Sequence, residues 1–110
     1  MCGIIGSISS KDISEDYIRS SLSSMNHRGP DSNGFKKFTK KRLGHIFLGH
    51  TRLSIIDLSN NGSQPMSDSD LNIHVTYNGE IYNFNEIKKE LYSKGYSFNS
   101  NTDTEVIIYA

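Results

Sequence analysis

The chain has 110 residues, of which 35% are hydrophobic, and its 12 basic and 12 acidic side chains give a formal net charge of +0. This length suits one domain, and the balanced charge argues against a nucleic-acid-binding or membrane-surface protein. No apolar run approaches the ~20 residues that span a bilayer, and the N-terminal residues lack the basic region and apolar core of a signal peptide, so we expect a cytoplasmic protein without membrane contact. One cysteine excludes an internal disulfide, and four scattered histidines give no zinc-site spacing.

The chain begins with Met1 followed directly by its only cysteine, Cys2. Removal of Met1 would leave Cys2 with a thiol and an α-amine on the same carbon, which combines a nucleophile and a base in one residue. By itself this position identifies no site, because a small residue is ordinary there. Residues 3–8 form a short apolar run with two glycines, which is typical of a buried strand that another group approaches closely.

A helix is predicted over residues 12–25. Asp12 and Glu15 have the spacing of a capping box, and apolar side chains recur on one face of the helix. The stretch 26–34 breaks this period and is predicted to be a loop. Its charged and polar side chains could act in catalysis or brace the loop by hydrogen bonds, and we favour bracing. The residues concerned are His27, Arg28 and Asp31.

Residues 35–38 and 45–50 are predicted to be two strands that flank a lysine-rich turn. Arg52 follows, just before an apolar stretch. An arginine in this position either covers apolar surface with its stem or presents its planar guanidinium to an anion such as a carboxylate. The spacing leaves both alternatives open. Residues 59–70 are rich in Ser, Asn, Asp and Gly and are predicted to be a loop.

Residues 71–77 alternate between apolar and polar side chains, which predicts a strand. The following Asn78-Gly79 pair usually marks a hairpin, but here Asn83 and Glu86 have the spacing of a capping box, and the helix pattern that follows stops at Gly95. We therefore predict a strand-to-helix junction. Such a junction can present a side-chain amide and a backbone N–H together, as two donors for an oxyanion.

A second capping-box pattern, Thr102 to Glu105, precedes the apolar residues 106–109. The chain stops at Ala110 after about two helical turns, and a helix that short is marginal without a packing partner. We expect the sequence to be part of a longer protein.

Five segments occur in the order seen in class II glutamine amidotransferases, which the chain therefore resembles. They are CGIIG at 2–6, HRGPD at 27–31, RLSIID at 52–57, YNGEIYN at 77–83 and TDTE at 102–105. Together they extend over almost the whole chain. The Arg-Gly-Pro-Asp form and the Asn-Gly-Glu-Ile-Tyr-Asn run are most similar to the glutaminase domain of glutamine-hydrolysing asparagine synthetase.

The resemblance implies an α+β fold of the N-terminal nucleophile hydrolase type, in which helices lie outside two antiparallel sheets. Residues 1–110 would be a type 2 glutamine amidotransferase domain that is truncated at its C-terminal end, with the synthetase domain absent. The resemblance implies no metal or cofactor in this part of the protein. ATP and magnesium are expected in the missing synthetase domain, which would receive the ammonia, and the complete protein could form a homodimer.

The resemblance also implies the roles of the site residues. Cys2 would attack the side-chain amide of glutamine after removal of Met1, and Asn78 with the Gly79 N–H would hold the oxyanion. Arg52 would bind the α-carboxylate of glutamine, and Glu80 with Asp103 would face its α-ammonium group. Backbone groups at Leu53, Ser54, Ile55 and Ile56 would line the same pocket. From the pattern alone, Asp103 could instead belong to a helix cap, and Glu80 could be a surface carboxylate.

The implied function is hydrolysis of glutamine to glutamate and ammonia for the ATP-dependent amidation of aspartate. One alternative is an amidotransferase with another acceptor, such as a sugar acid in surface polysaccharide synthesis. A non-catalytic alternative is a truncated remnant or binding module that retains the fold without turnover. The acceptor would be chosen outside residues 1–110.

Overall fold

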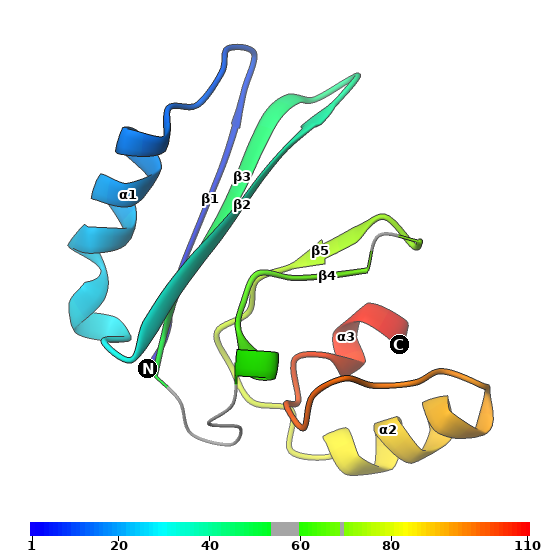
Figure 1. Ribbon diagram of the computed structural model, residues 1–110. Helices are drawn as coiled ribbons and strands as arrows, with labels where there is room; N and C mark the ends of the chain where they lie inside the picture. The colour runs from blue at the N-terminus through cyan, green and yellow to red at the C-terminus, as the bar shows by residue number, and fades with distance from the viewer. Residues whose placement is uncertain (54–59, 69) are drawn as a thin grey trace.

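The computed structural model describes residues 1–53, 60–68 and 70–110, and these ranges form an α+β structure (Figure 1). The elements in chain order are β1 (Gly3–Ser9), α1 (Glu15–Ser24), η1 (Asn26–Arg28), β2 (Ser32–Lys40), β3 (Gly44–Arg52), η2 (Asn60–Gly62), β4 (Met66–Asp68), β5 (Ile73–Val75), α2 (Phe84–Ser93) and α3 (Val106–Tyr109). The helices in the described ranges are too short or too polar to traverse a bilayer.

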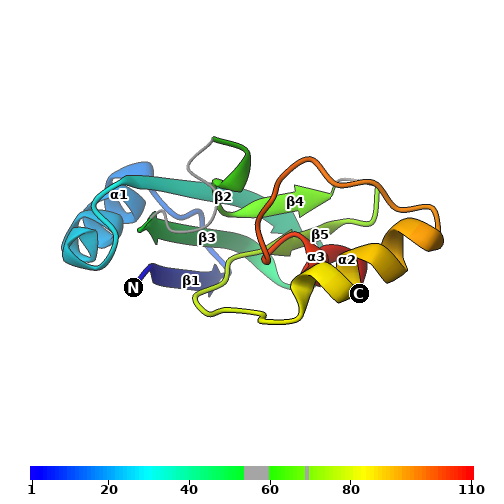
Figure 2. The ribbon, with the colours of Figure 1, turned by 90° about the horizontal axis from the view of Figure 1, so that it is seen from below.

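The larger sheet has three antiparallel strands in the order β1-β3-β2. Helix α1 covers one face of this sheet (Figure 2). The apolar core between them is formed by side chains of the α1 region and of the central strand, namely Ile13, Ile18, Leu22 and Phe47. Phe47 and Ile18 are 0% exposed. The central strand β3 is thus paired on both edges and covered by α1 on one face.

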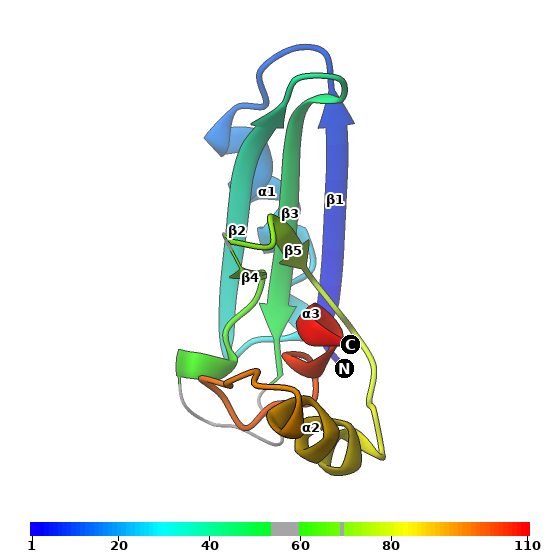
Figure 3. The same ribbon diagram turned by 90° about the vertical axis from the view of Figure 1, so that its right-hand side faces the viewer.

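The short hairpin β4–β5 lies over the other face of the larger sheet, and α3 packs beside β5 (Figure 3). The Thr76 hydroxyl donates a hydrogen bond to the Gly49 carbonyl at 3.3 Å, and the Phe38 and His74 rings are 4.2 Å apart. The larger sheet therefore lies between α1 on one face and the β4–β5 hairpin on the other.

Side chains alternate along β3 and so divide between the two faces of the sheet. Phe47, Gly49 and Thr51 face α1, where Thr51 donates a hydrogen bond to the Met25 carbonyl at 3.3 Å. His50 and Arg52 therefore lie on the opposite face. Gly3 pairs with Thr51 in the register of β1 with β3, so the preceding residue, Cys2, comes next to Arg52 at the end of the strand pair.

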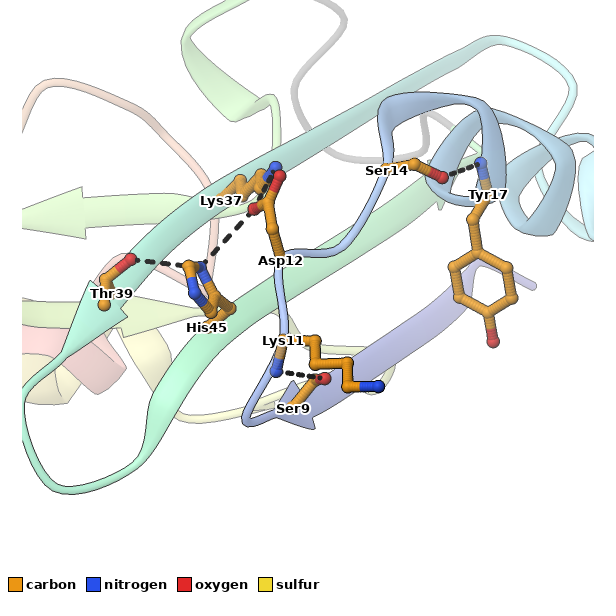
Figure 4. Close-up of polar contacts among 8 residues, drawn as sticks. All are labelled: Ser9, Lys11, Asp12, Ser14, Tyr17, Lys37, Thr39 and His45. Atoms are coloured by element: carbon orange, nitrogen blue, oxygen red, sulfur yellow. Dashed lines mark hydrogen bonds and ion pairs between the residues drawn. The ribbon is translucent and has the colours of Figure 1, made fainter.

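The predicted start of the first helix is wrong by three residues. Helix α1 begins at Glu15, and the hydroxyl of Ser14 accepts the capping hydrogen bond from the Tyr17 N–H at 3.3 Å. The carboxylate of Asp12 instead pairs with Lys37 at 2.7 Å and lies 3.4 Å from His45 (Figure 4). The Asp12 carboxylate thus binds the Lys37 ammonium of β2 instead of capping the helix.

The strands over residues 35–38 and 45–50 are confirmed, although both are longer than predicted. The strand predicted over residues 71–77 is confirmed only at Ile73–Val75, and the predicted loop 59–70 contains β4, which pairs with it. Pairing over three residues limits both strands. Apolar and polar side chains alternate beyond the hydrogen-bonded residues, so a prediction from this alternation overestimates the length of the strand.

The predicted strand-to-helix junction is confirmed, since β5 ends at Val75 and α2 begins after Asn83. The helix ends before Gly95, whose φ of 94° is readily adopted by glycine. The capping box predicted from Asn83 is wrong, because this side chain makes no capping hydrogen bond to α2.

The capping box predicted at residues 102–105 is also wrong. The Glu105 carboxylate reaches back along the chain and accepts hydrogen bonds from the Asn99 N–H at 2.8 Å and the Ser100 N–H at 2.7 Å. Helix α3 consequently begins only at Val106. Residues 102–104 are left as a buried turn against the rest of the structure.

Candidate active site

A pocket of about 330 Å³ opens where Cys2, the end of β3, the strand-to-helix junction and the turn before α3 meet. Its volume lies within the range of about 300–1,000 Å³ that small-molecule sites occupy. The residues that line it are Met1, Cys2, His50, Arg52, Leu53, Gly62, Gln64, Tyr77, Asn78, Gly79, Glu80, Tyr82, Thr102, Asp103 and Thr104. In the described residues, no three His, Cys, Asp or Glu side chains are grouped so that they could hold a metal ion.

The Cys2 sulfur is held by backbone groups of the segment that follows β3. The Leu53 N–H donates a hydrogen bond to Cys2 Sγ at 3.3 Å, and Sγ lies 3.6 Å from the Leu53 carbonyl. Arg28 Nε donates to the Cys2 carbonyl at 3.2 Å, which confirms the bracing role expected for this loop residue. The half-buried thiol is thereby fixed at the pocket wall.

Met1 also lines the pocket and is 78% exposed. While Met1 is present, the free α-amine belongs to Met1, and the nitrogen of Cys2 is part of a peptide bond. A peptide nitrogen is not a base. Removal of Met1 would place the α-amine directly beside the thiol.

Arg52 is 8% exposed and closes the inner side of the pocket. Gly62 allows its guanidinium this position, because a Cβ on Gly62 would fall against Arg52 Nη2, with Thr102 Cγ2 only 2.8 Å away. A buried guanidinium in a pocket offers a planar, permanently charged group for a carboxylate.

Asn78 and Gly79 lie in the junction between β5 and α2 and are exposed to solvent at the pocket. The Tyr77 ring packs over Gly79, and a Cβ there would overlap the Tyr77 hydroxyl and lie 2.6 Å from Cζ. The side-chain amide of Asn78 and the N–H of Gly79 are hydrogen-bond donors, so the junction supplies the donor types expected from the sequence.

Two carboxylates lie at the pocket in different environments. Asp103 is 6% exposed, and its Oδ2 accepts a hydrogen bond from the Ile81 N–H at 2.8 Å. Glu80 is exposed. Because Asp103 and Glu80 line the same pocket as Arg52, the site has both signs of charge, as a zwitterionic amino acid requires.

The structure thus brings Cys2, Arg52, Leu53, Asn78, Gly79, Glu80 and Asp103 to one pocket. The remaining residues proposed for it, Ser54, Ile55 and Ile56, lie outside the described residues. Sequence reasoning did not single out several other lining residues, of which His50 and Gln64 make informative contacts. His50 could have been found from its position, since residues two apart in a strand share a face.

His50 is 1% exposed, and its Nε2 has no hydrogen-bond partner within the described parts of the chain. Burial lowers the pKa of His50, and the nearby Arg52 charge lowers it further, while a hydrogen bond with the Tyr77 backbone acts in the opposite direction. The buried imidazole is therefore neutral at neutral pH.

We expect His50 to make folding sensitive to mild acid. Because its pKa in the folded state is lowered, the unfolded chain binds more protons below pH ~6.5, and the free energy of unfolding falls as pH decreases through that value. His50→Gln should reduce this decrease between about pH 7 and pH 5, as measured by urea unfolding. His27→Gln, at an exposed position, is the matched control and should leave it unchanged. An equal decrease in the free energy of unfolding between about pH 7 and pH 5 for the wild type and His50→Gln would contradict this expectation.

Residues 1–110 match the family described as the glutamine amidotransferase domain, so the chain belongs to the glutamine amidotransferase family. Asparagine synthetases are among its relatives. It is 41% identical over 113 residues to glutamine-hydrolyzing asparagine synthetase 1 of Bacillus subtilis, covering 98% of this chain and 17% of the relative. It is 38% identical to putative glutamine-hydrolyzing asparagine synthetase 2 of Methanocaldococcus jannaschii, covering 98% and 23%.

The relatives also include proteins with another named reaction. The chain is 35% identical to the isomerizing glutamine–fructose-6-phosphate aminotransferase of Sulfolobus acidocaldarius, with 97% of this chain and 22% of the relative covered. The chain spans less than a quarter of the length of these three relatives. The family resemblance seen in the sequence is confirmed, whereas the acceptor of the amide nitrogen differs among the relatives.

Proposed function

We propose that this chain hydrolyses glutamine to glutamate and ammonia, with Cys2 as the nucleophile after removal of Met1. The observation that supports this function best is the convergence of Cys2, Arg52, Asn78 and Asp103 on one pocket from four separate segments. The glutamine amidotransferase family to which the chain belongs takes glutamine as its substrate.

In the first half of the proposed reaction, the Cys2 sulfur attacks the side-chain amide carbon of glutamine. The α-amine of Cys2 takes the thiol proton, and the carbonyl oxygen becomes an oxyanion that the Asn78 amide and Gly79 N–H stabilise. The α-amine then gives the proton to the amide nitrogen. The carbon–nitrogen bond breaks, ammonia leaves, and a γ-glutamyl thioester remains on Cys2.

In the second half, water attacks the thioester carbon, again with the α-amine of Cys2 as the base. The same two donors hold the second oxyanion. The carbon–sulfur bond breaks, glutamate leaves, and the sulfur recovers its proton. No oxidant, reductant or metal is needed for this sequence.

Substrate recognition in this proposal uses the charges of the pocket. The Arg52 guanidinium binds the α-carboxylate of glutamine, because two parallel hydrogen bonds fix its orientation. Asp103 and Glu80 attract the α-ammonium group, and Leu53 lines the same pocket. Asp103 Oδ2 also anchors the Ile81 N–H, which orients the carboxylate.

Replacing Arg52 with alanine is expected to raise KM for glutamine by about 10- to 100-fold, corresponding to the loss of a charge-assisted contact of about 1.5–3 kcal/mol. Arg52→Lys should give a smaller increase, since lysine keeps the charge but not the planar fork. The KM of both variants is measured from steady-state glutamate release by the natural full-length protein. Arg42→Ala, in the exposed β2–β3 turn, is the matched control and should leave KM unchanged. An equal loss of glutamine-dependent and ammonia-dependent activity would make Arg52 structural.

We further propose aspartate as the acceptor of the ammonia, in an ATP-dependent synthetase part outside residues 1–110, where ATP and magnesium would bind. The identities of 41% and 38% to two asparagine synthetases support this choice. The natural full-length protein should form asparagine from glutamine, aspartate and ATP. Amidation of a sugar acid, or formation of a sugar amine from fructose 6-phosphate, would replace this assignment and leave the glutaminase proposal intact.

A further inference from the structure

Gln64 lies between two segments of the pocket wall, and its side-chain amide contacts both. Its Oε1 accepts a hydrogen bond from the Tyr77 N–H at 2.6 Å, and its Nε2 donates to Thr104 Oγ1 at 3.2 Å. A backbone N–H can only donate, so the atom that faces Tyr77 must be the amide oxygen. One side chain thus joins the start of the strand-to-helix junction to the turn before α3.

A second contact joins the same two segments. The Ile81 N–H donates to Asp103 Oδ2 at 2.8 Å, so Tyr77 and Ile81 are both tied to the turn that contains Asp103 and Thr104. Asn78 and Gly79 lie between these two fixed points. Both ends of the short segment that carries the oxyanion donors are therefore anchored to one buried turn.

The junction depends on such side-chain contacts, because β5 ends at Val75 and α2 begins only at Phe84. On the side of the larger sheet, the buried His50 ring contacts the Tyr77 backbone and the Thr76 hydroxyl donates to the Gly49 carbonyl at 3.3 Å. Gln64 therefore secures Tyr77 on one side, while the central strand secures it on the other.

We propose that Gln64 is a positioning residue that holds the Asn78 and Gly79 donors in place relative to the Cys2 sulfur. This inference rests on the proposed glutaminase function. Gln64 acts through Tyr77 and Thr104 rather than on the substrate, so its loss shifts the donors that act on the charge of the transition state. Displacement of such groups by about 1 Å can lower a rate by ~10²-fold.

Three variants test this inference in the natural full-length protein. Gln64→Met keeps the length of the side chain but removes both hydrogen bonds, and it should lower kcat for glutamine by about 10- to 100-fold with KM changed by less than about threefold. Gln64→Glu keeps an acceptor for the Tyr77 N–H, and the Thr104 hydroxyl can turn to donate to it, so this variant should retain more activity. Ser63→Ala, at an exposed neighbouring residue, should match the wild type.

Thr104→Val completes a double-mutant cycle. It removes the hydroxyl that accepts from Gln64 Nε2, so the combined Gln64→Met/Thr104→Val variant should lose no more activity than Gln64→Met alone. Fully additive losses would show that the two residues act independently, which would overturn the inference.

The alkylation rate of Cys2 by iodoacetamide separates positioning from a general structural role. The Cys2 contacts come from Leu53 and Arg28, so this rate should be unchanged in Gln64→Met. A lower kcat with unchanged alkylation and unchanged urea midpoint supports the inference. An unchanged kcat, or a parallel loss of alkylation rate and stability, overturns it. Loss of the proposed function has a different signature, namely glutamine hydrolysis that persists in Cys2→Ala.

Discussion

Replacing Cys2 with alanine is expected to lower glutamine hydrolysis by at least ~10⁴-fold, because no other group in the proposed mechanism can form the acyl intermediate. The change deletes the sulfur atom that accepts from the Leu53 N–H, while the Arg28 hydrogen bond to the backbone carbonyl of residue 2 remains. The pocket should therefore keep its shape. Glutamate release from purified full-length protein is the measurement.

Glutamine binding provides the control for this variant. Cys2→Ala should bind glutamine with an affinity close to that of the wild type, as measured by calorimetry, because Arg52 and Asp103 are unchanged. Formation of product from free ammonia should also persist. Retained hydrolysis of glutamine by the alanine variant would exclude Cys2 as the nucleophile, whatever its position in the pocket.

Replacing Asn78 with alanine is expected to lower kcat for glutamine by about 10²–10³-fold, the usual effect of losing one oxyanion donor. KM should change little, since the donor acts mainly on charge that develops in the transition state. Steady-state kinetics with glutamine separate the two parameters. Asn78 is exposed, so the change should leave the free energy of unfolding nearly unaffected.

Asn83→Ala is the matched control for Asn78. Asn83 is also an exposed asparagine of the junction, and it makes no side-chain capping bond to α2. Asn83→Ala should therefore leave kcat unchanged. If Asn78→Ala raised KM and left kcat at the wild-type value, Asn78 would bind the substrate rather than the oxyanion.

Much of the fold could be predicted from local patterns. The strand predicted at residues 3–8 is confirmed as β1 (Gly3–Ser9), but it is an edge strand whose Ile4 and Ile8 side chains are exposed, so its predicted burial is wrong. The absence of a strand pattern after Asn78-Gly79 correctly indicated a junction rather than a hairpin. Gly95 was recognised as a helix stop because a positive φ favours glycine, and its φ is indeed 94°. These features depend on a few adjacent residues.

The errors arose where a residue that has the spacing of a helix cap bonds to other groups in the folded chain. Asp12 has the spacing of a helix cap but pairs with Lys37, and Glu105 bonds to the backbone of Asn99 and Ser100. Neither partner can be identified from a capping pattern. The three-residue hairpin β4–β5 was likewise missed in part, because its extent is set by pairing between strands.

In the candidate site, too, the residues that belong to local motifs could be predicted, whereas those that act through contacts elsewhere in the fold could not. The motifs pointed to Cys2, Arg52, Asn78 and Asp103, which the structure brings to one pocket. Gln64 was not predicted, because its role depends on contacts with residues 13 and 40 positions away. A polar residue within a composition typical of a loop gives no local signal of such contacts.

The most direct test of the proposed mechanism is mass analysis of the natural full-length protein quenched in acid during turnover with glutamine. We expect the N-terminal peptide to begin at Cys2, without Met1, and to carry one γ-glutamyl group on its sulfur. The same peptide from Cys2→Ala should carry none. An active protein that retains Met1, or a γ-glutamyl group on any other residue, would contradict the mechanism.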